Sequence, residues 1–263
     1  MFAAAGRLIC CSARNKQVSP RGRRGCDGRA AGAYLLNDAM SFIVAEECLR
    51  LGLRAGAVIF RDVRVTPSSP ALRAEIAREA QTVQERFTDA AAVRAAPEVV
   101  SFSEVLKKVG VNPRRDQPSV ERLLTFALKR GDLPAINSLV DAYNLVSIRT
   151  LCSLGAHDLD ALTPPVTLRI LTGGESFTPL GSSAAVPVTP GEFGYVDAAS
   201  RVLCRLDVLQ TDFSKVTTAT RNALLIIEGT TAHAPEAFAQ AFAEAVELIT
   251  RYCGGTAEVI ASP

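Results

Sequence analysis

The chain has 263 residues, of which 48% are hydrophobic and 21% are charged, and its formal net charge is +2. These proportions describe an ordinary soluble globular protein, and no apolar run reaches the roughly 18 residues that a membrane span needs. The seven cysteines show no paired C-x-x-C spacing and there are only two histidines, so we expect neither a metal site nor a cofactor. The odd cysteine count, without a secretory apolar segment, favours reduced thiols and a cytoplasmic location.

Residues 1–39 hold seven basic and two acidic side chains, a net charge of +5, which leaves −3 for the rest of the chain. This segment has no periodic apolar pattern, and we interpret it as a disordered basic leader that is dispensable for folding. It is either a nucleic-acid-binding arm or sequence upstream of a native start at Met40. A single domain is then expected over residues 40–263.

The first half of this domain is predicted to be mainly helical. Helix-capping residues, early prolines and apolar residues at helical spacing support this interpretation. In chain order we expect a helix over 42–51, a strand over 54–65, a helix over 68–87, a linker over 95–100, and helices over 101–111 and 117–131.

After residue 160 the pattern changes to short β-rich runs separated by Gly, Pro and Ser. The expected strands lie within 166–172, 191–198, 201–210 and 222–229, and a last helix covers 234–255. Helices first, strands later and a final helix predict an α+β fold rather than a strictly alternating one. The Gly-Ser segments at 172–176 and 179–183 fit hairpin connections, or turns whose backbone N–H groups face an anion.

A further helix is predicted from Ile136 onward, and it carries an unusual polar stripe. Asn137, Asp141 and Asn144 follow one another at helical spacing beside an apolar face. Asn and Asp are poor helix-interior residues because their short side chains compete for backbone hydrogen bonds. The stripe therefore indicates a specific role.

Four motifs appear in order: IN-x-x-VD-x-x-N at 136–144, GA-x-DLD at 155–160, GE-x-F-x-x-LG at 174–181, and a strand that ends in Glu228. Together they resemble the B3/B4 domain of the phenylalanyl-tRNA synthetase beta subunit, and more closely its freestanding single-domain form, over residues 100–229. The resemblance implies helices packed on a mixed, largely antiparallel sheet or a partly open barrel.

In the synthetase, this domain hydrolyses tyrosine that is wrongly attached to tRNA-Phe. The resemblance therefore implies a trans-editing hydrolase, an aminoacyl-tRNA deacylase whose partner is mischarged tRNA. Nothing in the chain resembles the aminoacylating module, so we do not expect a synthetase. A non-catalytic tRNA-binding or RNA-binding module is one alternative, and an interaction protein or small-molecule enzyme on a reused fold is another.

The resemblance also implies which residues form the site. The polar stripe would be catalytic, although Asn137 and Asp141 would alternatively be scaffold residues. Glu228 matches the glutamate that reads the tyrosine hydroxyl, and would otherwise be a solvated strand end. The implied site comprises catalytic Asn137, Asp141 and Asn144, substrate-binding Glu228, Gly173, Gly174 and Arg130, and tRNA-binding Lys107, Lys108, Arg114 and Arg115.

One position departs from the synthetase pattern. Gly155 stands where the synthetase has a histidine, and His157 occupies the position of an aromatic residue. We expect His157 to be a packing or hydrogen-bonding residue, and the edited amino acid stays open. An aminoacyl ester is already activated, so we expect oriented dipoles and an ordered water, without a Ser, Cys or His nucleophile.

Overall fold

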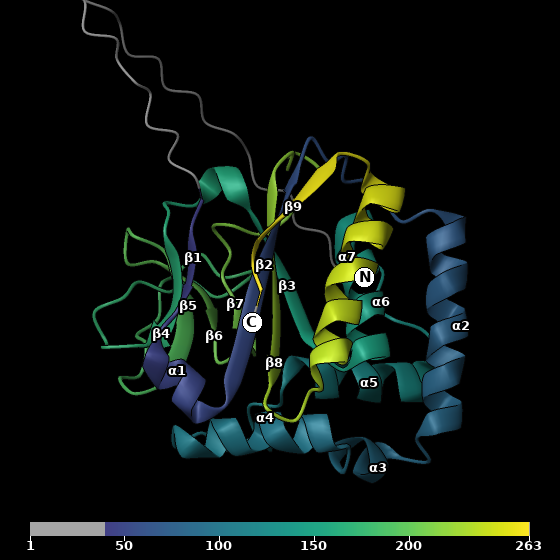
Figure 1. The fold of residues 1–263 in the computed structure, drawn as a ribbon, viewed down its shortest axis with the longest axis horizontal. Helices are drawn as coiled ribbons and strands as arrows, with labels where there is room; N and C mark the ends of the chain where they lie inside the picture. Colours follow the sequence, from purple (N-terminus) through teal and green to yellow (C-terminus); the bar gives the residue numbers. More distant parts are fainter. Residues whose placement is uncertain (1–39, 263) are drawn as a thin grey trace, which may run out of the picture. The chain divides into compact units, whose positions relative to one another are not determined.

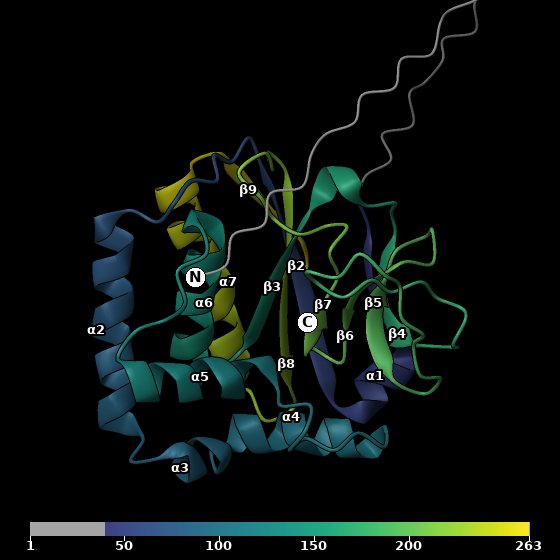
Figure 2. The ribbon, with the colours of Figure 1, turned by 180° about the vertical axis from the view of Figure 1, so that it is seen from behind.

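The computed structural model describes residues 40–262, and the prediction of a basic leader at residues 1–39 lies outside them. Two β-sheets pack face to face, and helices cover the other face of one of them, as Figure 1 and the reverse view in Figure 2 show. The predicted α+β class is confirmed.

The first sheet is mixed, because β1 runs parallel to β4 while the other neighbours are antiparallel. In spatial order its strands are β1 (Phe42–Val44), β4 (Val166–Ile170), β5 (Phe193–Val196), β6 (Val202–Arg205) and β7 (Leu209–Gln210). The second sheet is antiparallel, in the order β3 (Ser153–Asp158), β8 (Ala223–Thr230), β2 (Leu53–Arg61) and β9 (Thr256–Ala261).

Strands β2 and β8 lie at the centre of the second sheet and are buried on both faces. Side chains alternate along a strand, so Ile59 and Ile226 enter the core between the sheets, whereas Val58 and Leu225 face the helices. A strand that is buried on both faces reads as a continuous apolar run, which explains why the sequence predicted both strands.

The helix that the sequence predicts over 68–87 begins at its expected capping residue. Ser69 accepts a hydrogen bond from the backbone N–H of Leu72, and Pro70 occupies the first turn. The helices are α1 (Glu46–Leu51), α2 (Pro70–Arg86), α3 (Ala90–Arg94), α4 (Pro97–Lys108), α5 (Ser119–Arg130), α6 (Ser138–Thr150) and α7 (Pro235–Cys253). Within residues 40–262, no helix is long and apolar enough to span a bilayer.

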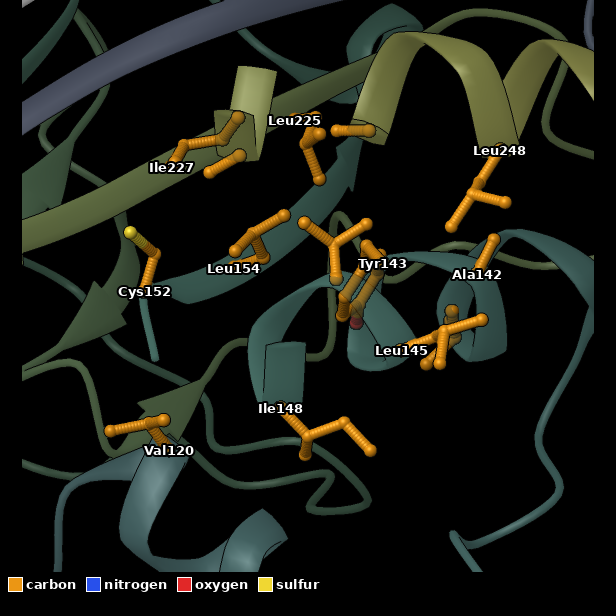
Figure 3. Packing of buried hydrophobic residues seen from close by; sticks show 14 of the residues in the cluster. Val120, Ala142, Tyr143, Leu145, Ile148, Cys152, Leu154, Leu225, Ile227 and Leu248 are labelled. Carbon is orange, nitrogen blue, oxygen red and sulfur yellow. The ribbon is translucent and has the colours of Figure 1, made fainter. Parts of the chain in front are cut away.

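Helix α6 lies inside the core, and each of its residues except Arg149 is buried. Figure 3 shows its side chains packed with Leu154 of β3, Leu225 and Ile227 of β8, and Leu248 of α7. A helix that is buried all round has no solvated face. The polar stripe of α6 is therefore enclosed by the fold.

The prediction of one helix over residues 42–51 was wrong. Phe42–Val44 forms β1, which pairs with β4, and the helix begins only at Glu46. Pairing with a distant strand decided the conformation of these three residues, which local helical spacing does not reveal.

Three further segments also differ from the predictions. The expected linker over 95–100 contains the start of α4, because Pro97 occupies its first turn. The run over 201–210 is a hairpin of β6 and β7 rather than one strand. The last helix is followed by β9, which pairs with β2 at the edge of the second sheet.

Candidate functional site

A cavity of about 340 Å³ lies where α5, α6, β3 and the β6–β7 hairpin meet. Its volume falls within the range of small-molecule sites, which combine apolar walls with a few polar groups. The apolar lining includes Leu123, Phe126, Ile136, Val140, Leu154 and Val208. The polar lining includes Ser119, Asn144, His157, Asp207 and Gln210.

Asn137 fixes the start of the helix that forms one wall. Its side-chain oxygen accepts hydrogen bonds from the backbone N–H groups of Leu139 and Val140, at 3.1 and 3.0 Å. An N-cap satisfies backbone donors that have no partner within the helix. Asn137 therefore positions α6, which carries Asn144 into the cavity.

Asp141 is fully buried and joins α6 to two other segments. Its carboxylate accepts hydrogen bonds from the Ser68 hydroxyl at 2.6 Å and from the Ile136 backbone N–H at 2.9 Å, and the Arg73 guanidinium lies 3.5 Å away. Among the three residues of the stripe, Asn144 lines the cavity, whereas Asp141 and Asn137 hold the helix in place.

Asp207 reaches the cavity from the turn between β6 and β7. Leu206 and Asp207 both have left-handed backbones, with φ of 60° and 58°, in a turn closed by the hydrogen bond from the Val208 N–H to the Arg205 carbonyl. The Asp207 carboxylate accepts hydrogen bonds from the hydroxyls of Ser153 and Ser119. Desolvation by the surrounding protein raises the pKa of Asp207 to about 7, against the lowering effect of these hydroxyls.

Glu228 lies between the two sheets, directly opposite Ser153 in the β3–β8 register. One of its carboxyl oxygens accepts a hydrogen bond from the Tyr195 hydroxyl, while Oε1 has no partner among the described residues. Desolvation, followed by the nearby Asp207 charge, raises the pKa of Glu228 well above its usual range. The glutamate that would read a substrate hydroxyl is thus already bonded to a hydroxyl of this chain.

His157 is buried, and its Nδ1 lies 2.9 Å from the Ser214 hydroxyl. Burial lowers the pKa of His157 to about 3, so the ring is neutral at physiological pH. Ser214 is itself fully buried and does not belong to the cavity lining. Ser119, Cys204 and His157 do line it, and the expectation that none of them is a nucleophile stays a prediction.

The family profile described as "B3/4 domain" matches residues 101–254, which is more than half of the chain. The chain belongs to the B3/4 domain family. One similar solved structure is an N-terminal fragment of the phenylalanyl-tRNA synthetase beta-subunit from Pyrococcus horikoshii, with 13% sequence identity and a TM-score of 0.43. That match covers 86% of this chain and 55% of the other. No curated protein sequence matches the chain.

Besides Asn137, Asp141 and Glu228, three more predicted substrate-binding residues of this B3/4 domain lie outside the cavity lining. Gly173 and Gly174 follow β4, and the Gly173 N–H donates to Glu175 at 2.9 Å. Arg130 is the last residue of α5, directly before the left-handed Gly131. Residues 40–262 contain no group of three or more His, Cys, Asp or Glu side chains that is suited to a metal ion.

The predicted tRNA-binding residues of the B3/4 domain lie at the end of α4 and in the loop that follows it. Lys107 pairs with Glu104, Lys108 donates to the Leu51 carbonyl, and Arg115 pairs with Asp116. Exposed Arg114 lines a second cavity, which also contains the buried Glu121. The positive charge of this segment is therefore partly balanced by neighbouring carboxylates.

The sequence did not predict three residues as part of the site: Asp207, Ser119 and Ser153. Their grouping arises because the β6–β7 turn meets the start of α5 and the start of β3. The turn carries Leu-Asp rather than the Asn-Gly or Asp-Gly that signals a hairpin, so the segment reads as one strand.

Proposed function

We propose that this B3/4 domain hydrolyses the ester bond of mischarged aminoacyl-tRNA, acting in trans on tRNA that a synthetase has released. The observation that carries the proposal is the 340 Å³ cavity, whose lining combines apolar walls with polar groups that include Asn144 and Asp207. Apolar walls suit an amino-acid side chain, and fixed polar groups suit the ester and its water. The ordered motifs over residues 100–229, with their resemblance to an editing domain, support tRNA as the substrate.

The side chains of the cavity divide these tasks. The Asn144 amide orients the ester carbonyl or the attacking water, and Phe126, Ile136 and Val140 contact the amino-acid side chain. The ester is activated already, so positioning and oriented dipoles supply most of the catalysis. We place this activity in the cytoplasm, and the free thiols of Cys48, Cys152, Cys204 and Cys253 support a reducing compartment.

The test is to incubate the protein with a panel of mischarged aminoacyl-tRNAs and to follow loss of the ester. We expect deacylation of at least one member of the panel above the spontaneous rate. Asn144→Ala should slow it by about tenfold to a thousandfold, the scale of one lost positioning or oxyanion contact. Gln81→Ala, which removes an exposed amide on α2, is the control and should keep the parent rate. Equal rates for both variants would remove Asn144 from the site.

A non-catalytic tRNA-binding module is the second candidate. The exposed Arg114 and Arg115, in the loop after α4, favour it, because contacts to phosphates bind tRNA without any catalytic group. A parent protein that binds tRNA and deacylates no member of the panel would establish this second function.

A further inference from the structure

Two carboxyl groups from different sheets approach each other beside the cavity. Ser153 lies opposite Glu228 in the antiparallel register, which places their Cβ atoms about 5 Å apart. The Ser153 hydroxyl donates to Asp207, so Ser153 contacts one carboxylate and adjoins the other. Asp207 is partly exposed and lines the cavity, whereas Glu228 is buried behind it.

The hydrogen bonding of Glu228 indicates its charge. Tyr195 donates to one oxygen, but Oε1 has no donor within residues 40–262. A buried carboxylate with a donor on only one of its oxygens is strongly disfavoured in the ionised form and takes up a proton instead. The Glu228 carboxyl is therefore the neutral member of the pair.

We propose that Asp207 and Glu228 share one negative charge at neutral pH, and that Asp207 is the general base that accepts a proton from the attacking water. This inference rests on the proposed ester hydrolysis. It assigns the proton transfer to a residue at the cavity wall, with Ser119 and Ser153 as the groups that orient its carboxylate.

The reaction then balances without another reactant. The water oxygen forms a bond to the ester carbonyl carbon while its proton moves to the Asp207 carboxylate. The tetrahedral intermediate collapses, and the bond between the carbonyl carbon and the ribose oxygen breaks. The proton on Asp207 passes to that ribose oxygen, which leaves a free amino acid and a tRNA with a free hydroxyl.

The titratable and charged groups that face Asp207 come from six elements. They are Arg122 from α5, Tyr143 from α6, His157 from β3, Tyr195 from β5, Cys204 from β6 and Glu228 from β8. Desolvation first, and nearby carboxylates second, raise the pKa of Tyr195 and Cys204 well above their usual values, and His157 is neutral. Arg122 is exposed and donates to the Val208 carbonyl at 3.4 Å.

The pH dependence of deacylation tests this assignment. After the spontaneous rate is subtracted, the deacylation rate of the parent should rise tenfold per pH unit at low pH. It should level off near pH 7, as Asp207 loses its proton. Asp207→Asn should lower the plateau by about 10²-fold to 10⁴-fold and abolish the inflection. Glu228→Gln replaces a neutral carboxyl with a neutral amide, so its inflection should stay near pH 7. Asp212→Asn changes a half-buried carboxylate that pairs with Lys215 outside the cavity lining, and it is the matched control.

Ser119→Ala provides a second variant in case Asp207→Asn does not fold. The Ser119 hydroxyl lowers the pKa of Asp207, so its removal should move the inflection to higher pH, which a purely structural role would not do. An unmoved inflection in Ser119→Ala, or a retained one in folded Asp207→Asn, would overturn the assignment. A large downward shift in Glu228→Gln would show that Glu228 is ionised and refute the shared charge.

A titration of the carboxyl ¹³C resonances separates this proposal from the proposed function. We expect one Asp carboxyl to titrate near pH 7, and its signal to disappear in Asp207→Asn. If this titration is seen but no aminoacyl-tRNA is deacylated, the hydrolase function and the base role both fail while the shared charge stands. If deacylation occurs without this titration, the function stands and the Asp207–Glu228 pair is refuted.

Discussion

At the scale of single residues, two carboxylates share the guanidinium of Arg73. Asp141 is fully buried and lies 3.5 Å from it, while Asp132 lies 2.6 Å from it with its side chain 47% exposed. Distance alone would make the Asp132 pair the stronger one. Solvent screens an exposed pair, however, and the entropy of holding two long side chains offsets much of its attraction.

We therefore predict that Asp141→Ala destabilises the fold by about 3 kcal/mol, because it leaves the Ser68 hydroxyl and the Ile136 backbone N–H without their acceptor. Asp132→Ala, the matched control, should cost less than about 1 kcal/mol. Urea unfolding followed by circular dichroism measures both. The reverse order would show that the buried carboxylate is not a scaffold group.

At the scale of elements, the turn from α7 to β9 depends on close backbone contact. Gly255 has a φ of +80°, and a Cβ at this position would lie 2.2 Å from the Arg61 carbonyl oxygen. Gly110, after α4, has a similar φ of +77°, yet a Cβ there would meet nothing within 4 Å. The two glycines thus separate backbone strain from steric overlap.

Gly110→Ala should cost about 1 kcal/mol, which is the strain of a left-handed backbone with a Cβ. Gly255→Ala should cost at least about 3 kcal/mol, since either β9 or the end of β2 must move. Thermal melts of the two variants, compared with the parent, measure this difference. Equal shifts in Tm would mean that the β9 edge yields without loss of packing.

At the scale of the whole molecule, we propose that the basic residues and the cavity contact different parts of the substrate. Lys107, Lys108, Arg114 and Arg115 belong to α4 and the loop after it, whereas residues 40–263 together carry a net charge of −3. Contacts to phosphates release counterions and make the affinity depend on salt, but they do not read the amino acid. Binding and hydrolysis should therefore respond to different mutations.

The double variant Arg114→Glu and Arg115→Glu should weaken tRNA binding and reduce the slope of log K against log salt by about 1–2. Its deacylation rate at saturating tRNA should stay near that of the parent. Arg78→Glu reverses an exposed positive charge on α2 and is the control. It should change the tRNA affinity and its salt dependence less than the double variant does. An unchanged salt slope in the double variant would assign the cluster to ordinary solvated surface.

Local patterns were sufficient for much of the fold. Ser69 and Pro70 mark the start of α2, and Gly131 marks the end of α5, because caps and breakers act within a few residues. The continuous apolar runs of β2 and β8 likewise identify strands that are buried on both faces. Phe42–Val44 lacked such a signal, since its extended conformation depends on pairing with β4, more than a hundred residues away.

By itself, the sequence determined the α+β class, most of the helices and the central strands, because short-range periodicity and capping encode them, and its ordered motifs showed the resemblance to the B3/4 family. Only the tertiary structure decided the environment of each polar side chain. Asn137 caps a helix, buried Asp141 pairs with the partly exposed Arg73 guanidinium and Asn144 reaches a cavity, although all three share one helical spacing. Asp207 joins that cavity through a hairpin turn, since burial and proton affinity depend on which distant segments enclose a group.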